Sequence, residues 1–206
     1  MPVHVADHPV VEHHLAHLRE KSTSPEQFRQ ATARLTWLLA FHATAQLATQ
    51  RVAVETPLTT TTGQRLSQRI GLVPIIRAGI AMVDPMLDML PHAEVWYLGL
   101  YRNEKTAEPV EYYNKLADFD PVDIAFVLDP MLATGGSACL AISALRDKGV
   151  SRTKLLSIIA SQTGIERVQN ESPQTDIYVC TIDAELNSQK FIVPGLGDAG
   201  DRAFNA

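Results

Sequence analysis

The 206-residue sequence has little cysteine and no excess of positive charge. Its two cysteines, Cys139 and Cys180, are too few for a disulfide framework and too far apart for a metal-binding spacing. We therefore expect two core thiols, one in a helix and one in a strand. The 18 basic and 23 acidic side chains give a net charge of -5, so no overall positive field attracts nucleic acid. We expect no nucleic-acid partner, and any bound phosphate must be held by local groups.

Long apolar runs are also absent. The longest ones, at 72–76 and 124–128, are far shorter than the roughly 18 residues that span a bilayer. The N-terminus carries His4, Asp7 and His8, where a signal peptide needs a basic start and an apolar core. We therefore expect a cytoplasmic protein with no membrane partner. Because 46% of the residues are apolar, we also expect a single well-buried domain over residues 1–206.

The apolar residues that are present alternate between helical and strand spacing. Residues 10–19 and 25–50 carry apolar side chains at helical spacing, and Thr23-Ser24-Pro25-Glu26 is a typical helix start. Short β-branched or aromatic runs predict strands at 71–76, 95–100, 124–128, 154–159 and 176–181. Segments of helical length lie between several of them, at 81–90, 137–148 and 164–170. This alternation predicts an α/β fold with a mainly parallel central sheet flanked by helices, which binds ligands at the carboxyl ends of its strands.

A strand, a turn of small residues and a helix follow one another in the middle of the chain. Gly135 and Gly136 let the backbone turn its N–H groups inward. Hydroxyl donors flank them at Thr134 and Ser137, and the start of the helix adds a partial positive charge. Together these features predict an anion-binding cradle. It is not a Walker A loop, because no lysine follows the glycines, and this argues against ATP hydrolysis.

Asp129 ends the strand before this cradle, where its carboxylate can accept hydrogen bonds from two neighbouring sugar hydroxyls. The segment Asp129-Pro-Met-Leu-Ala-Thr-Gly-Gly-Ser137 resembles the motif by which type I phosphoribosyltransferases bind 5-phosphoribosyl-1-diphosphate (PRPP). Many of those enzymes have a second acid where this chain has Pro130, and in this respect the chain is similar to the uracil phosphoribosyltransferase family. Further segments resemble that family in the same order, at residues 8–11, 73–79, 108–115 and 192–202.

The resemblance implies an enzyme that transfers the phosphoribosyl group of PRPP to N1 of uracil and gives UMP and pyrophosphate. It implies the type I phosphoribosyltransferase fold, with a polar hairpin lid at 102–115 and a C-terminal base-binding hood at 182–204. The lid segment could instead be a solvated hairpin without a role; we favour a lid, because reactive phosphoryl sugars need shielding from water. The implied cofactor is Mg²⁺, bound mainly through PRPP and water, with no metal ligand assigned in the protein. A homodimer or homotetramer is implied as well, whereas activation by GTP, known for some members, is left open.

Carried over to the matching positions, the resemblance implies catalytic roles for Asp129, Arg77 and Arg102. Asp129 would orient the ribose, and the two arginines would hold the pyrophosphate. The implied PRPP-binding residues are Arg77, Arg102, Asp129, Pro130, Met131, Leu132, Ala133, Thr134, Gly135, Gly136, Ser137 and Asp198. The implied uracil-binding residues are Ile192, Gly197, Asp198 and Ala199, three of them through backbone groups that distinguish uracil from cytosine. Asn103 stands where the family more often has an acid, so it is given no metal or proton role.

Other interpretations have less support in the sequence. Residues 195–200 satisfy the Gly-x-Gly-x-x-Gly pattern, but we reject dinucleotide binding, because we expect neither a following helix nor a ribose-binding acid about 20 residues on. His13 and His17 share a helix face without an evident third metal ligand. A regulatory RNA-binding protein with the same fold is disfavoured by the absence of a basic cluster, and the tail at 195–200 disfavours specificity for a purine or another base.

Overall fold

The computed structural model describes residues 2–102, 109–114 and 120–205. Its central sheet has the strand order β1-β11-β10-β8-β4-β6-β7. These strands are β1 (Val3–Val5), β11 (Asp176–Asp183), β10 (Thr153–Ser161), β8 (Ile124–Leu128), β4 (Ile70–Ile76), β6 (Leu98–Arg102) and β7 (Pro109–Asn114). Neighbouring strands are parallel except for β6 and β7, which are antiparallel. The predicted α/β class with a mainly parallel sheet is therefore confirmed.

Two short strands extend this sheet. β5 (Glu94–Val95) pairs with β4, and β9 (Met131–Leu132) pairs with β10. The single strand predicted at 95–100 is therefore wrong, because the chain forms β5 and β6 instead, with Trp96 and Tyr97 between them. Between β5 and β6, the backbone N–H of Trp96 still donates a hydrogen bond to the carbonyl of Leu72 in β4 at 2.8 Å, and the indole is buried. The sequence therefore shows a continuous apolar run although the strand is interrupted.

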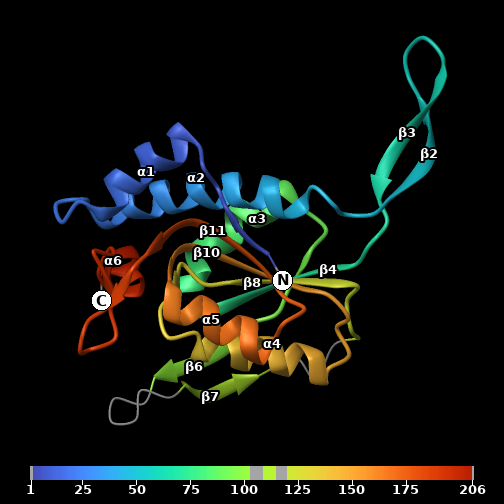
Figure 1. The fold of residues 1–206 in the computed structure, drawn as a ribbon. Coiled ribbons are helices and arrows are strands. Elements are labelled where there is room, and N and C mark those ends of the chain that lie inside the picture. The colour runs from blue at the N-terminus through green and yellow to red at the C-terminus, as the bar shows by residue number, and fades with distance from the viewer. Residues whose placement is uncertain (1, 103–108, 115–119, 206) are drawn as a thin grey trace.

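Helices cover both faces of the sheet (Figure 1). One face carries α1 (Pro9–Arg19), α2 (Pro25–Thr44), the 3₁₀ helix η1 (Ala78–Met82) and α3 (Val83–Met89), and the other carries α4 (Gly136–Asp147) and α5 (Gln162–Glu171). Each face has its own apolar core, because side chains alternate along a strand. In β8, Phe126 packs in the core under α1 and α2, whereas Val127 packs in the core under α4. The predicted helices at 10–19, 81–90, 137–148 and 164–170 are confirmed within a few residues.

The start of α2 is as predicted. Ser24 and Gln27 form a reciprocal capping box, and Pro25 occupies the first turn. The predicted end at residue 50 is wrong, since the helix ends at Thr44. Near this end the buried ammonium of Lys154 donates a hydrogen bond to the carbonyl of Ala43 at 2.7 Å. Its positive charge lies at the negative end of the helix dipole, which is a favourable position for a cation.

The segment after α2 forms an antiparallel hairpin of β2 (Thr49–Glu55) and β3 (Thr60–Leu66), which projects from the body of the molecule (Figure 1). The polar run Thr59–Thr62, just before Gly63, is of a kind typical of loops, yet three of its four residues lie in β3. Threonine is β-branched and suits an extended backbone, and Thr61 and Thr62 pair with Val54 and Ala53. The sequence pattern does not predict this strand, because most of its side chains are exposed and it has no alternating apolar face.

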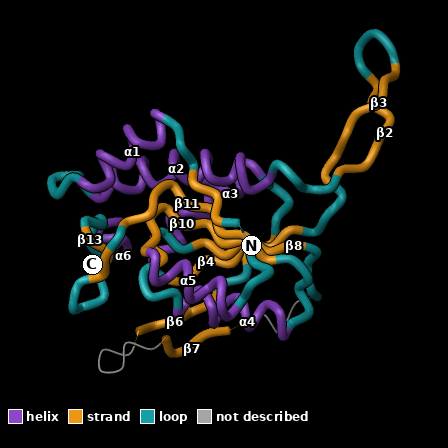
Figure 2. The backbone as a smooth tube through the Cα atoms, viewed as in Figure 1, coloured by secondary structure: helices purple, strands orange, loops and turns teal. Residues whose placement is uncertain are grey.

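The C-terminal residues fold back towards α1 and α2. They contain β12 (Glu185–Leu186), its antiparallel partner β13 (Ile192–Val193), and α6 (Ala199–Phe204), which packs on α2 and η1. Figure 2 shows β13 and α6 together at the end of the molecule opposite the β2–β3 hairpin. Cys139 in α4 and Cys180 in β11 are buried free thiols, as predicted. In the described chain, no helix is both long enough and apolar enough to cross a membrane.

Candidate functional site

The site lies where β4 and β8 end side by side. The two strands are parallel and in register, with Pro74 opposite Leu128, so the residues that follow them meet at one edge of the sheet. Arg77 follows β4, and Asp129 follows β8. Gly79 brings the two loops together, because a Cβ atom there would lie 2.3 Å from the carbonyl oxygen of Leu128. Only glycine permits this close approach of the backbones.

The cradle after β8 has the geometry of a helix start that is open to an anion. Gly135 occupies the N-cap of α4 with φ of 77°, and among the described residues no side chain caps this end of the helix. Its first N–H groups therefore remain available to a ligand. A side chain at position 135 would be strained by the positive φ and would lie 2.9 Å from the carbonyl oxygen of Gly164.

The first turn of α5 supports this cradle from behind. The hydroxyl of Ser161 donates a hydrogen bond to the carbonyl of Ala133 and accepts one from the N–H of Gly164 at 2.9 Å. A Cβ atom at Gly164 would lie 2.6 Å from the carbonyl oxygen of Ala133 and 2.7 Å from that of Leu132. The sequence analysis missed Ser161 and Gly164. A glycine three residues after a capping serine, in the first turn of an amphipathic helix, is the signal that could have identified them.

Asp129 is partly buried at the end of β8. Burial and the negative charge of Asp198 raise its pKa to about 7, although the N–H of Met131, 3.2 Å from Oδ1, acts in the opposite direction. Asp198 caps the N-terminus of α6 by accepting a hydrogen bond from the N–H of Asp201 at 2.9 Å. The negative charge of Asp198 therefore acts in the same direction as burial and disfavours ionisation of Asp129.

The predicted base-binding residues extend from β13, which contains Ile192, through a tightly turned loop to the start of α6 at Ala199. Ile192 and Ala199 are buried, whereas Gly197 is exposed with φ of 78°. Gly195 has φ of 59°, and a Cβ atom there would lie 2.0 Å from the carbonyl oxygen of Ile192. The positive φ values of Gly195 and Gly197 give the loop its tight turns, and binding of a base by its backbone groups remains a prediction.

Arg77 reaches from the loop after β4 to α6. Its guanidinium lies 2.8 Å from Oδ1 of Asp201, and both side chains are about half exposed. The sequence analysis did not identify Asp201. The ion pair joins the arginine predicted to bind pyrophosphate to α6, whose N-cap is Asp198.

Part of the predicted site lies outside the described residues. Arg102 ends β6, which runs parallel to β4, so its backbone lies at the same edge of the sheet. The strands of the predicted lid hairpin, β6 and β7, are antiparallel as expected. Residues 103–108 and 115, including Asn103, lie outside the described residues, so the lid remains a prediction.

Two alternatives raised by the sequence, a dinucleotide site and a histidine metal site, can be compared with the described structure. The Gly-x-Gly-x-x-Gly segment at 195–200 follows the two-residue strand β13, which lies outside the central sheet. A short helix, α6, does follow it, contrary to expectation, but the strand–turn–helix of a dinucleotide site is not formed. The rings of His13 and His17 lie edge to face at 4.9 Å. Over the ranges that the structure describes, no three His, Cys, Asp or Glu side chains are grouped to hold a metal ion.

Comparisons with known proteins agree with this geometry. The sequence model of the family "Uracil phosphoribosyltransferase" matches residues 5–206. A uracil phosphoribosyltransferase from Roseiflexus sp. (strain RS-1) is 49% identical over 202 residues, which is 98% of this chain and 97% of the relative. A solved structure of a protein from Aquifex aeolicus superposes with a TM-score of 0.93 at 33% identity and covers 99% of this chain and 98% of that one.

A more distant likeness concerns the fold alone. The adenine phosphoribosyltransferase from Thermoanaerobacter pseudethanolicus superposes with a TM-score of 0.50 at 13% identity, over 74% of this chain and 81% of that one. The central sheet and its flanking helices are therefore those of a type I phosphoribosyltransferase.

Proposed function

Because the chain belongs to the uracil phosphoribosyltransferase family, we propose that it transfers the phosphoribosyl group of PRPP to N1 of uracil. The products are UMP and pyrophosphate, and the enzyme is a pentosyl transferase of pyrimidine salvage. The observation that carries this proposal is the uncapped start of α4, which shortly follows Asp129 at the carboxyl end of β8. A sugar phosphate fits the cradle and the carboxylate, and a flat base fits the loop of backbone groups opposite.

PRPP binds, in this proposal, across the ends of β8 and β4. The backbone from Met131 to Ser137 holds the 5′-phosphate, because the uncapped start of α4 offers N–H donors and a partial positive charge. Asp129 accepts hydrogen bonds from the ribose hydroxyls. Arg77 and Arg102 hold the pyrophosphate, for which the planar guanidinium is well suited. Arg77 must then exchange its present partner, Asp201, for the ligand.

Uracil binds in the hood, where the backbone of Ile192, Gly197 and Ala199 meets the edge of the base. A site that donates an N–H to O4 of uracil would leave a donor facing the amino group of cytosine. An unpaired buried donor of this kind can discriminate by a factor of about 10⁴ in favourable cases. The support for this role is the tight turn between β13 and α6, where Gly195 and Gly197 both have positive φ.

Magnesium fits this site as a partner of the substrate. Asp129 and Asp198 are close enough for the charge of one to raise the pKa of the other, and Mg²⁺ is usually held by one or two carboxylates together with substrate phosphates and water. Asp198, with Asp129 opposite, would hold the ion through water and PRPP. When bound, Mg²⁺ neutralises charge on the pyrophosphate.

Catalysis then depends on positioning and charge. N1 of uracil attacks C1′ of PRPP from the face opposite the pyrophosphate, and the ribosyl group becomes oxocarbenium-like as the bond to pyrophosphate breaks. Asp129 holds the ribose in place, and Arg77 and Arg102 stabilise the negative charge that develops on the leaving group. No covalent intermediate with the protein is needed.

The proposal also covers assembly, location and regulation. We extend the proposal to a homodimer or homotetramer in the cytoplasm, as the resemblance implies. GTP is included as a candidate activator.

The test is to mix purified protein with PRPP, Mg²⁺ and radiolabelled uracil or cytosine, and to follow nucleotide formation with and without GTP. The proposal predicts UMP from uracil, formed only with Mg²⁺, and no nucleotide from cytosine. Binding of PRPP or UMP without product from any base would contradict it and favour a regulatory protein of the same fold.

A further inference from the structure

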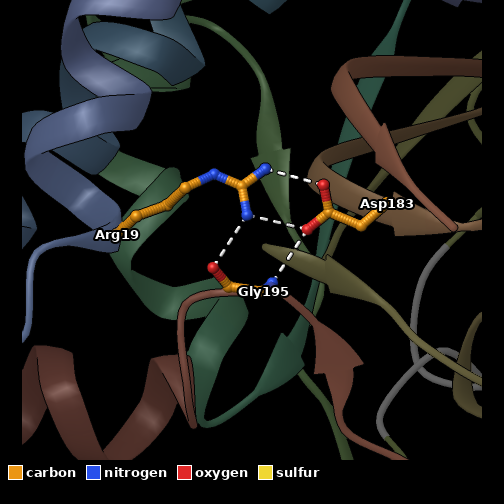
Figure 3. A network of polar contacts seen from close by, with 3 residues as sticks. All are labelled: Arg19, Asp183 and Gly195. Atoms are coloured by element: carbon orange, nitrogen blue, oxygen red, sulfur yellow. Dashed lines mark hydrogen bonds and ion pairs between the residues drawn. The ribbon is translucent and has the colours of Figure 1, made fainter. Parts of the chain in front are cut away.

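One ion pair holds both backbone polar groups of Gly195 (Figure 3). Arg19, the last residue of α1, donates two parallel hydrogen bonds to the carboxylate of Asp183, at 2.7 and 2.8 Å. The same guanidinium donates a third hydrogen bond to the carbonyl of Gly195 at 2.8 Å. The N–H of Gly195 in turn donates to Oδ2 of Asp183 at 2.9 Å. Arg19 thus forms a closed network with two residues that lie more than 160 positions further along the chain.

This network lies in the middle of the loop that carries the base-binding groups. Gly195 lies between Ile192 and Gly197, whose backbones meet the edge of uracil in the proposed function. The loop is tightly turned at Gly195, since a Cβ atom there would lie 2.0 Å from the carbonyl oxygen of Ile192. A displacement of Gly195 would therefore move the groups on both sides of it.

The network connects the loop to the rigid parts of the fold. Asp183 ends β11 in the central sheet and its side chain is only 6% exposed, whereas that of Arg19 is 26% exposed. Burial by itself would raise the pKa of Asp183, but the hydrogen bonds from Arg19 and Gly195 outweigh it and lower the pKa. The carboxylate is therefore ionised at neutral pH, and paired with a guanidinium fork that lysine cannot reproduce.

We propose that Arg19 and Asp183 are positioning residues for the pyrimidine: their ion pair fixes Gly195, and with it the backbone groups that recognise uracil. This inference rests on the proposed function, because it assigns the loop at 192–199 to the base. Neither residue touches the substrate. Their loss should therefore weaken recognition of the base and leave recognition of the ribose phosphate unchanged.

The test compares Arg19→Lys with Arg29→Lys. Arg29 is a matched control, because it also joins the helical layer to the hood, with a hydrogen bond to the carbonyl of Ala203 at 2.6 Å, but it does not contact the loop. Each variant is titrated with UMP, CMP and ribose 5-phosphate, and the KM values for uracil and PRPP are measured. Because a misplacement of about 1 Å can cost up to 10²-fold, we expect Arg19→Lys to weaken UMP binding and raise the KM for uracil by about 10-fold or more.

The same variant should keep its affinity for ribose 5-phosphate and its KM for PRPP within about 2-fold, and so should Arg29→Lys for all ligands. A folded Arg19→Lys protein with wild-type affinity for UMP and a wild-type KM for uracil would overturn the inference. If Arg19→Lys does not fold, Asp183→Asn, which keeps an acceptor for the N–H of Gly195, takes its place with the same expectations. Wild-type protein that binds CMP as well as UMP would instead contradict the proposed function itself.

Discussion

Two carboxylates of the site have opposite electrostatic environments. Asp129 accepts a single hydrogen bond from the backbone and lies near Asp198, so its pKa rises to about 7. Asp183 is paired with Arg19 and Gly195, so its pKa falls. The carboxylate of Asp183 already accepts hydrogen bonds from Arg19 and Gly195, and these favour its ionised form. Asp129 is less favoured in its ionised form, which is typical of a carboxylate in a functional site.

The raised pKa of Asp129 predicts a pH dependence of stability. The folded state holds a proton on Asp129 up to about pH 7, whereas the unfolded chain loses it near pH 4, so the stability of the ligand-free protein falls as pH rises between these values. Asp129→Asn removes this loss. We compare the free energy of unfolding of the variant with that of the wild type by thermal unfolding at two pH values. The difference, variant minus wild type, should be larger at pH 8 than at pH 5 by about 1 kcal/mol or more.

The comparison of pH 5 with pH 8 is the control, because a general effect of the substitution on folding would be the same at both. An equal difference between variant and wild type at the two pH values would show that the pKa of Asp129 is not raised.

The ion pair between Arg77 and Asp201 predicts competition with the substrate. The carboxylate of Asp201 occupies the guanidinium that is proposed to bind pyrophosphate. Since an exposed pair is worth up to about 1 kcal/mol, Asp201→Asn should lower the KM for PRPP by about 2- to 5-fold. The measurement is steady-state kinetics with PRPP varied at saturating uracil.

Glu94→Gln is the matched control, because Glu94 forms a similar exposed ion pair with Arg69 at 2.7 Å, in β5 beside the amino end of β4. It should leave the KM for PRPP unchanged. A raised KM in Asp201→Asn would mean that Asp201 assists PRPP binding rather than competing with it.

At the scale of elements, the cradle depends on the packing of α5 behind it. α4 supplies the N–H groups and α5 supplies the support, through Ser161 and the close contact at Gly164. α5 therefore contributes to ligand binding only by supporting the cradle, and its residues are not part of the binding motif at 129–137.

Gly164→Ala tests this support. The added methyl group would meet two backbone carbonyl oxygens that cannot rotate away, so we expect a loss of about 1–3 kcal/mol in the free energy of unfolding. The shifted cradle should also bind ribose 5-phosphate more weakly. Chemical denaturation and calorimetric titration measure the two effects.

The control for this prediction is Gly63→Ala in the β2–β3 hairpin, where the new methyl group would meet the methyl carbon Cγ2 of Val54. It should leave the affinity for ribose 5-phosphate at the wild-type value. Wild-type stability and affinity in Gly164→Ala would show that the loop is not supported by α5.

The sequence predicted the buried elements better than the exposed ones. The central strands and the start of α2 follow from apolar runs and a capping box, both of which are local signals. The last turn of α2 is contacted by Lys154, which is distant in the sequence, and β3 has no buried face to produce a pattern. In the site, the cradle and Asp129 were found from a contiguous motif. Arg19, Asp183 and Asp201 were missed because their contacts join segments more than a hundred residues apart.

At the scale of the whole molecule, the site joins two differently built parts. The loops after β4 and β8 extend directly from the central sheet and are proposed to bind PRPP. The hood that is proposed to bind uracil is held by arginine contacts to α1 and α2, including the cation–π contact of Arg202 with Phe28 at 4.6 Å. Recognition of the base and of PRPP can therefore be perturbed separately.

The central claim is that the edge of the sheet at Asp129 is where PRPP reacts. The measurement that tests it most directly is kcat/KM for PRPP of Asp129→Asn beside the wild type, in the assay of UMP formation at pH 8. Because positioning of the ribose is lost, we predict a decrease of about 10²-fold or more, in a protein that unfolds as cooperatively as the wild type. An unchanged kcat/KM would remove Asp129 from the site and contradict the account.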